Sequence, residues 1–440
     1  MSGGIFSPKA NAFLAGHAER LAETQATEVV GRVEALVAAH DRWRGGESLN
    51  LNPAEGLLSR RARALLNSDL ATRLTEGAPG DKAYPHGPLN EQIDEIEATV
   101  IALAQRLFGA RYVEWRPVSN SMANAVVFAA LLKPGDLILA QDEDGGGNYS
   151  YHPSGPAGVF GARVVPMART DPNFEIDLAG VARQVAEHRP RMLVFGGSKV
   201  LFPYPIRELR AIADSVGALL VCDAAHLGLH ISRGDFQRPL AEGAHIVTLS
   251  THKVMGGPVG GLVLSDDLSI AQAVAKTMFP GLLQTRDLNK YAALAVSLSE
   301  VLAFGDQLAR AMRENAQALA SALSARGFDL LASERGFSRT HQLFLRFSDA
   351  NRAAEFERRC HAANIFLADC ALAGDLAKGA RTGARAATHE VTRLGMGVAE
   401  MDEIAGLIYD ADQGASVELL RGRVAALAQR FSRINFSFDP

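Results

Sequence analysis

The middle of the chain alternates short apolar runs with longer stretches in which apolar residues recur every three or four positions. The apolar runs are LILA (137–140), ARVVPM (162–167), RMLVFG (191–196), ALLVCD (218–223), HIVTLS (245–250) and GGLVLS (260–265). Such short runs, separated by helical patterns, are typical of strands in a parallel sheet that helices cover. The pattern therefore predicts an α/β fold with a mostly parallel sheet and with ligands at the carboxyl ends of the strands.

Helical periodicity dominates on either side of this region. Residues 1–45 predict two helices with polar faces, and because such an arm is too short to fold alone, we expect it to pack on the main body or on a second subunit. Further helices are predicted at 93–110 and 291–330, followed by a strand at 342–347 and a helix at 351–363. We expect an N-terminal helical arm (1–45), a large domain (46–290), and a linking helix with a smaller C-terminal α/β domain (291–440).

Composition narrows the range of partners. A formal net charge of −4 offers no basic surface for nucleic acid or an anionic membrane, and no apolar run approaches the roughly 20 residues of a membrane span. The first residues lack the basic-then-apolar pattern of a secretory signal. The cysteines at 222, 360 and 370 have no metal-ligand spacing, and one is left without a pair. We therefore expect a cytoplasmic protein with a small-molecule substrate and no metal, nucleic acid or membrane partner.

The stretch STHKVMGGPVGG (250–261) carries the strongest chemical signal. Lys253 follows His252 and precedes a run of glycines that brings the backbone close to a neighbouring group. Asp223 ends an apolar strand thirty residues earlier, and His226 lies just beyond it. Pyridoxal phosphate chemistry needs this pair: a lysine that forms a Schiff base with the cofactor, and a carboxylate that keeps the pyridine nitrogen protonated. Taken alone, Lys253 could be a solvated lysine in a glycine loop, and Asp223 could be a core aspartate that caps a turn.

Two further segments offer candidate ligands. Ser119, Asn120 and Ser121 begin an apolar helix, where hydroxyls and free N–H groups suit a phosphate, although an ordinary serine N-cap explains the same letters. Glu76 and Tyr84 lie in a Gly/Pro loop, where they are either exposed loop residues or an acid/base and a substrate donor.

The loop at 142–153 and the smaller domain add candidates that the sequence does not resolve. Asn148 follows the strand at 137–140 and would lie at the edge of the site, as would its neighbours in the loop. An arginine of the smaller domain would clamp a substrate carboxylate. Arg381 is the candidate for that role, with Arg385 and Arg393 as competitors that spacing cannot separate.

The order of the motifs TEGAPGDKAY, RPVSNSMANAVVFAALLKPGD, ADSVGALLVCDAAHLGLH, STHKVMGGPVGG and MFPG resembles that of the serine hydroxymethyltransferases over roughly residues 46–410. The resemblance implies a fold-type-I pyridoxal phosphate enzyme whose active site is shared across a homodimer or a dimer of dimers. The roles it implies are Schiff-base lysine for Lys253, ring-nitrogen partner for Asp223, cofactor neighbours for His226 and His252, phosphate ligands for Ser119, Asn120 and Ser121, acid/base for Glu76, second-subunit contact for Tyr84, and carboxylate clamp for Arg381.

The chain departs from the family pattern at several of these positions. The family's substrate-contacting serine falls on Ala54, its ring-stacking histidine on Asn148, and the tyrosine before the catalytic glutamate on Leu74. The paired glycines that meet the partner's phosphate are Gln284 and Thr285. The C-terminal third is more similar to the threonine transaldolase and α-methylserine branches than to the folate enzyme.

We therefore expect aldol or retro-aldol chemistry on a β-hydroxy amino acid of the serine, threonine or α-methylserine type, without folate and with an aldehyde as possible co-substrate. A tetrahydrofolate-dependent hydroxymethyltransferase is the first alternative. A racemase, decarboxylase or aminotransferase is the second, because these enzymes use the same lysine–aspartate pair. A relative that binds the cofactor but has lost activity is the non-catalytic alternative.

Overall fold

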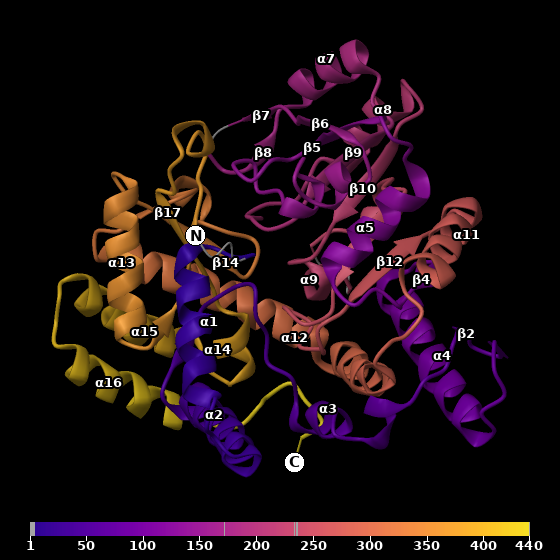
Figure 1. Ribbon diagram of the computed structural model, residues 1–440. Helices are drawn as coiled ribbons and strands as arrows, with labels where there is room; N and C mark the ends of the chain where they lie inside the picture. The colour runs from indigo at the N-terminus through magenta and orange to yellow at the C-terminus, as the bar shows by residue number, and fades with distance from the viewer. Residues whose placement is uncertain (1–4, 171, 233, 235, 440) are drawn as a thin grey trace.

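A seven-stranded sheet lies at the centre of the larger of two units (Figure 1). The computed structural model describes residues 5–439 apart from 171, 233 and 235. The strand order is β4-β12-β11-β10-β9-β5-β6, and the neighbours from β11 to β6 are all parallel. Its strands are β4 (Tyr112–Glu114), β5 (Leu137–Ala140), β6 (Arg163–Pro166), β9 (Met192–Gly196), β10 (Leu219–Asp223), β11 (Ile246–Ser250) and β12 (Gly261–Ser265). The predicted α/β fold with a mostly parallel sheet is confirmed.

Two details of the sheet were not predicted. Strand β12 runs antiparallel to β11, and the edge strand β4 runs antiparallel to β12. Periodicity does not show strand direction. Strand β4 was missed because it is only three residues long and mixes polar with apolar positions, so it lacks the apolar run that marked the other strands.

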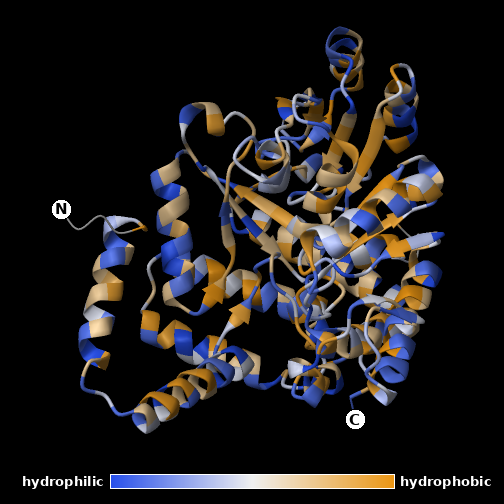
Figure 2. Cartoon of the chain, turned by 45° about the vertical axis from the view of Figure 1, so that its right-hand side comes forward, coloured by the Kyte–Doolittle hydropathy of each residue, from blue (hydrophilic) through white to orange (hydrophobic). Residues whose placement is uncertain are grey.

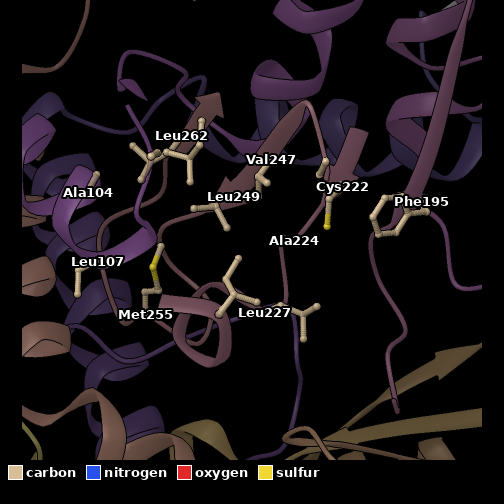
Figure 3. Close-up of a cluster of buried hydrophobic side chains, with 14 of the residues drawn as sticks. Ala104, Leu107, Phe195, Cys222, Ala224, Leu227, Val247, Leu249, Met255 and Leu262 are labelled. Atoms are coloured by element: carbon tan, nitrogen blue, oxygen red, sulfur yellow. The ribbon is translucent and has the colours of Figure 1, made fainter. Parts of the chain in front are cut away.

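Helices cover both faces of the sheet. Alternate strand residues point to opposite sides, so Leu193 and Leu220 join one core while Met192 and Val221 join another. The first face packs on α4 (Pro88–Phe108), α7 (Leu178–His188), α8 (Ile206–Asp214) and α12 (Leu288–Ala325), and the second on α5 (Asn120–Leu131), α6 (Pro156–Val159) and α11 (Leu268–Lys276). Figure 3 shows the first core, where Phe195, Cys222 and Leu249 lie among the buried side chains.

A second, antiparallel sheet of order β13-β14-β17-β16 forms the smaller unit. Its strands are β13 (Asp329–Leu330), β14 (Gln342–Arg346), β16 (Ala368–Cys370) and β17 (Gly383–Ala387), and α13 (Ala350–Ala362), α15 (Val398–Asp412) and α16 (Val417–Gln429) pack with it. Helix α12 connects the units, since Leu298 belongs to the large core and Leu319 to the small one. The domain bounds stay predictions, and one segment differs from them: β1 (Leu49–Asn50) pairs with β15 (Ile365–Phe366) in the smaller unit, because its leucine side chain fills that core.

The N-terminal arm lies against the outside of the molecule (Figure 2). It consists of α1 (Pro8–Leu21) and α2 (Ala26–Gly46), and neither helix has a buried residue. Its base is held by Trp43, which packs edge-on against Phe366 with ring centroids 4.9 Å apart. Phe13 and Val37 remain 69% and 56% exposed, so the arm leaves apolar surface uncovered within one chain.

Helix α12 is the one described helix that is long and apolar enough to cross a membrane by length and composition. More than half of its most apolar window, 56%, is buried inside the protein. Because it joins the two cores, this apolar character is that of a core helix.

Candidate active site

Asp223 ends strand β10 and is fully buried. Its carboxylate accepts hydrogen bonds from the Ala225 N–H (3.0 Å), from Asn124 Nδ2 (2.8 Å) and from Asn120 Nδ2 (3.0 and 3.2 Å). Burial raises the pKa of this carboxyl, while the amide donors and the charge of Lys253 oppose that rise. The site therefore contains a buried acid surrounded by donors that favour its ionised form.

Lys253 lies in the turn after β11, the parallel neighbour of β10. Val254 and Met255 anchor this turn in the core, at 2% and 1% exposure. The Nζ atom of Lys253 lies 3.0 Å from Nε2 of His226. Burial lowers the pKa of Lys253 to about 8, the charge of Asp223 opposes this shift, and that of Arg385 adds to it. A larger fraction of neutral, nucleophilic amine is thus present near neutral pH than in an ordinary lysine.

Glycines let the lysine turn approach its neighbours. Gly256 has φ +60°, a conformation that other residues rarely adopt. A Cβ on Gly261 would lie 2.5 Å from the carbonyl oxygen of Ser119. The first residue of β12 must therefore be glycine for this strand to contact the start of α5. These glycines bring the lysine turn and the start of helix α5 to the same end of the sheet.

The start of α5 holds three predicted phosphate ligands, and their side chains point to different partners. Ser119 is the N-cap and accepts from the Met122 N–H at 3.1 Å. Ser121 is exposed and lies 3.4 Å from Ser150 Oγ. The side chain of Asn120 instead turns inward to Asp223. Ser119 and Ser121 thus keep their hydroxyls at the helix start, whereas Asn120 points toward the carboxylate.

Asn148 lies in the loop after β5. Its Nδ2 donates to Ser198 Oγ at 3.2 Å, and its Oδ1 accepts from the Ser150 N–H at 2.9 Å. Because Ser198 follows β9, these bonds place Asn148 at the carboxyl ends of the strands. His252, the other predicted cofactor neighbour, has Nδ1 2.9 Å from Ser250 Oγ, and burial lowers its pKa to about 4.

A cluster of buried histidines backs Lys253. His226 stacks on His341 with centroids 6.3 Å apart, His341 Nδ1 lies 3.1 Å from His230 Nε2, and His389 meets His341 edge-on. Burial lowers the pKa of His226 and His341 well below the usual value and that of His389 to about 4, so these rings are neutral near pH 7. Sequence analysis missed all but His226, since they come from distant segments. Within the described part of the chain, no cluster of histidine, cysteine and acidic residues has the arrangement of a metal site.

The structure separates the three arginine candidates. Arg381 is 38% exposed and pairs with Glu143 at 2.6 Å, and Arg393 is paired with Glu300 in the core. Arg385, on β17, donates through Nη1 to the carbonyl of Ser198 at 2.7 Å, and its buried Nε has no partner among the described residues. Its charge also lowers the pKa of Lys253. Arg385 is therefore the arginine with both a free donor and an electrostatic link to the lysine.

Glu76 and Tyr84 lie in a different part of the chain. Glu76 precedes the short hairpin of β2 (Gly77–Ala78) and β3 (Asp81–Lys82), which packs beside α4, apart from the carboxyl end of β10 (Figure 1). Lys82 holds the hairpin through an ion pair with buried Glu97 at 2.5 Å. Tyr84 is 51% exposed. Among the residues described, neither Glu76 nor Tyr84 bonds to Lys253, Asp223 or His226, so one chain does not bring the two groups together.

One departure from the family pattern, Ala54, lies at a cavity of about 840 Å³. Ala54, Glu55 and His252 line it, together with Arg44 from the N-terminal arm. Arg44 forms an ion pair with Glu55, which joins the arm to this wall. Leu74 is 37% exposed, and Gln284 and Thr285 are also exposed, so all three face outward in the single chain.

The doubly covered sheet, with a lysine turn after one strand and a buried acid at the end of its neighbour, defines the fold-type-I class of pyridoxal phosphate enzymes. The chain belongs to the serine hydroxymethyltransferase family, whose sequence pattern it matches over residues 31–408, and this confirms the resemblance seen in its motifs.

Individual relatives fall into both branches considered from the sequence. The chain is 35% identical over 430 residues to serine hydroxymethyltransferase of Korarchaeum cryptofilum, covering 94% of this chain and 98% of that one. It is 37% identical over 419 residues to α-methylserine aldolase of Variovorax paradoxus, covering 94% and 92%. The crystal structure of L-threonine transaldolase from Pseudomonas fluorescens in its internal aldimine state superposes with a TM-score of 0.87 at 24% identity, over 94% and 95% of the chains, which shows the shared fold.

Proposed function

We propose that this protein binds pyridoxal phosphate at Lys253 and catalyses aldol or retro-aldol cleavage of a β-hydroxy amino acid without folate. The observation that carries the proposal is the pairing of an amine of lowered pKa, in the turn after β11, with a fully buried acid at the end of the adjacent parallel strand β10. The residues present fit the cofactor. His226 Nδ1 is buried beside Lys253 and has no partner among the described residues, so it can bond to a ligand.

When bound, the cofactor would supply a pyridine ring that accepts the electron pair left on the α-carbon as the carbon–carbon bond breaks. Lys253 would hold it covalently, Asp223 would keep its ring nitrogen protonated, and the start of α5 with Ser119 and Ser121 would bind its phosphate. Asn148 and His226 would flank it. An asparagine at position 148 offers a smaller planar surface for stacking than the histidine that the family pattern has there.

The substrate carboxylate would bind Arg385, whose unpaired donor is buried near Lys253. Arg381, the candidate favoured by the sequence, is occupied by Glu143. Glu76 would take the proton of the β-hydroxyl and Tyr84 would bond the substrate, both from a second subunit, since neither contacts Lys253 in its own chain. This makes a homodimer, or a dimer of dimers, the working form, and we expect it in the cytoplasm.

Independence from folate is supported by the changed positions 54, 74 and 148 and by the α-methylserine aldolases among the relatives. The alternative, a tetrahydrofolate-dependent hydroxymethyltransferase, is supported by the relatives of that name. A racemase, decarboxylase or aminotransferase would need the same lysine and acid, but the family membership favours cleavage at the β-carbon.

The test is to incubate the purified protein with serine, threonine and α-methylserine singly, with and without tetrahydrofolate, and to measure the aldehyde and amino acid products. We expect equal amounts of aldehyde and product amino acid from at least one substrate without folate. Turnover that appears only with tetrahydrofolate would establish the alternative, and racemisation or decarboxylation without aldehyde would contradict both.

A further inference from the structure

The carboxylate of Asp223 has all of its acceptor positions occupied by the protein. A carboxylate offers about four lone-pair positions on its two oxygens. The Ala225 N–H takes one on Oδ1 and Asn124 takes one on Oδ2. Asn120 Nδ2 spans both oxygens, at 3.0 and 3.2 Å. A further donor to Asp223 must therefore displace one of these three groups.

Asn124 is fixed at both ends of its amide. Its Nδ2 donates to Asp223 and its Oδ1 accepts from Thr248 Oγ1 at 2.7 Å. Thr248 lies on β11 opposite Asp223 in the strand register, so this chain of bonds joins two strands and helix α5. Asn124 is 1% exposed, and turning its side chain would break two buried hydrogen bonds. The Ala225 N–H belongs to the backbone and cannot turn away.

Asn120 is held at one end only. It lies one helical turn before Asn124 on α5, and its Nδ2 contacts Asp223. Its Oδ1 is buried and has no partner among the described residues, so nothing fixes the far side of the amide. Of the three donors around Asp223, Asn120 is the one whose displacement breaks no other bond.

We propose that Asn120 is a displaceable partner of Asp223, which turns away when the protonated ring nitrogen of the cofactor binds that carboxylate. This inference rests on the proposed function. It makes Asn120 a positioning residue that acts through Asp223, in place of the phosphate ligand expected from the sequence. The amide holds the carboxylate oriented until the ring N–H replaces it, and its unpaired Oδ1 can then turn toward another donor.

The two asparagines should respond oppositely to the same substitution. Asn120→Ala removes a competitor of the cofactor, so affinity should rise about tenfold or more, as expected when a bond to a charged group need not be broken. Asn124→Ala removes a fixed support of Asp223 and leaves Thr248 without its acceptor, so affinity should fall by at least as much. Alanine favours the helix at both positions.

The experiment titrates pyridoxal phosphate into cofactor-free wild type, Asn120→Ala, Asn120→Ser and Asn124→Ala, and follows the visible absorbance of the bound cofactor. We expect tighter binding by both Asn120 variants and weaker binding by Asn124→Ala. The rise in Tm that the cofactor causes should also be larger in the Asn120 variants than in wild type.

Unchanged or weaker cofactor binding by both Asn120 variants, with wild type binding normally, would overturn this inference and leave the proposed function standing. Failure of the wild-type protein itself to bind pyridoxal phosphate would overturn the proposed function and this inference with it. Circular dichroism and the Tm of the cofactor-free variants separate a changed site from a misfolded chain.

Discussion

At the scale of single residues, burial changes the acid–base chemistry of the site. The pKa of Lys253 is lowered because its ammonium is desolvated. Burial also raises the pKa of Asp223, and the hydrogen-bond donors around its carboxylate oppose that rise. The sequence predicted both residues, since a lysine turn and a strand-end acid on neighbouring strands meet at one edge of a parallel sheet. It could not predict the inward turn of Asn120 or the histidines at 230, 341 and 389, because tertiary packing alone brings those side chains together.

The choice between arginines yields a residue-scale prediction. Arg385→Gln should raise the KM for the amino acid on the order of a hundredfold, because it removes a buried cation from the substrate carboxylate. Arg381→Gln serves as the matched control. It removes a partly buried ion pair with Glu143 but leaves Arg385 to bind the carboxylate, so steady-state kinetics should show less than a threefold change. A large KM effect of Arg381→Gln with normal kinetics for Arg385→Gln would restore the assignment made from the sequence.

The neutral histidines predict acid sensitivity. Burial lowers the pKa of His389 from 6.5 to about 4, so between these pH values the unfolded chain binds a proton that the folded protein does not. Its stabilising effect is present above pH 6.5 and is lost as the pH falls toward 4, at up to about 1.4 kcal/mol per pH unit. In urea unfolding of the cofactor-free protein over this range, His389→Asn should give a shallower loss of stability on acidification than wild type. If the free energy of unfolding falls equally with pH in the two proteins, His389 does not contribute to the acid sensitivity.

At the scale of secondary structure, apolar runs located six of the seven strands of the large sheet, and periodicity located the long helices α4 and α12. The short edge strand β4 and the antiparallel direction of β12 were missed, because neither leaves a mark in hydrophobic patterning. The segment around β1 was also assigned to the large domain, although its partner strand β15 lies more than three hundred residues later in the chain. Long-range pairing of that kind is outside the reach of local patterns.

Packing of the lysine turn yields an element-scale prediction. A Cβ on Gly56 would lie 2.0 Å from the carbonyl oxygen of His252 and 2.3 Å from that of Lys253. Gly56→Ala must therefore push the turn away, and should cost about 1–3 kcal/mol of stability together with affinity for the cofactor. Thermal unfolding and a cofactor titration measure both effects.

Gly31→Ala is the control, because a Cβ there meets nothing within 4 Å on an exposed part of α2. It should be neutral or slightly stabilising, with unchanged cofactor binding. If Gly56→Ala also leaves stability and cofactor binding unchanged, the close approach of Gly56 to the carbonyls of His252 and Lys253 does not position the lysine turn.

At the scale of the whole molecule, one chain does not complete the proposed site. Glu76 and Tyr84 flank the β2–β3 hairpin, which lies beside α4 and apart from the carboxyl end of β10 (Figure 1), and the N-terminal arm leaves apolar side chains exposed. Sequence patterns predicted the arm and its helices but not where it lies, since that depends on contacts of Trp43 and Arg44 with distant segments. A symmetric dimer would account for both features.

Mixed dimers test whether Tyr84 acts across the subunit boundary. Lys253→Ala and Tyr84→Phe chains should each have low activity. If Tyr84 serves the partner, a hybrid dimer carries one site with both defects and one intact site, so mixing and re-equilibrating the two proteins should restore part of the activity. Activity that stays at the level of the separate variants would place Tyr84 in the site of its own chain.

Borohydride reduction tests the central claim, that Lys253 is the residue that carries the cofactor. The competing buried lysine is Lys199, whose Nζ is committed to the carbonyls of Glu143 and Ala371 at 2.5 and 2.6 Å. After reduction of the cofactor-loaded protein and peptide mapping by mass spectrometry, we predict the phosphopyridoxyl group on Lys253 and its loss in Lys253→Ala. Labelling of Lys199 in the wild-type protein, or no label on any lysine, would contradict the account.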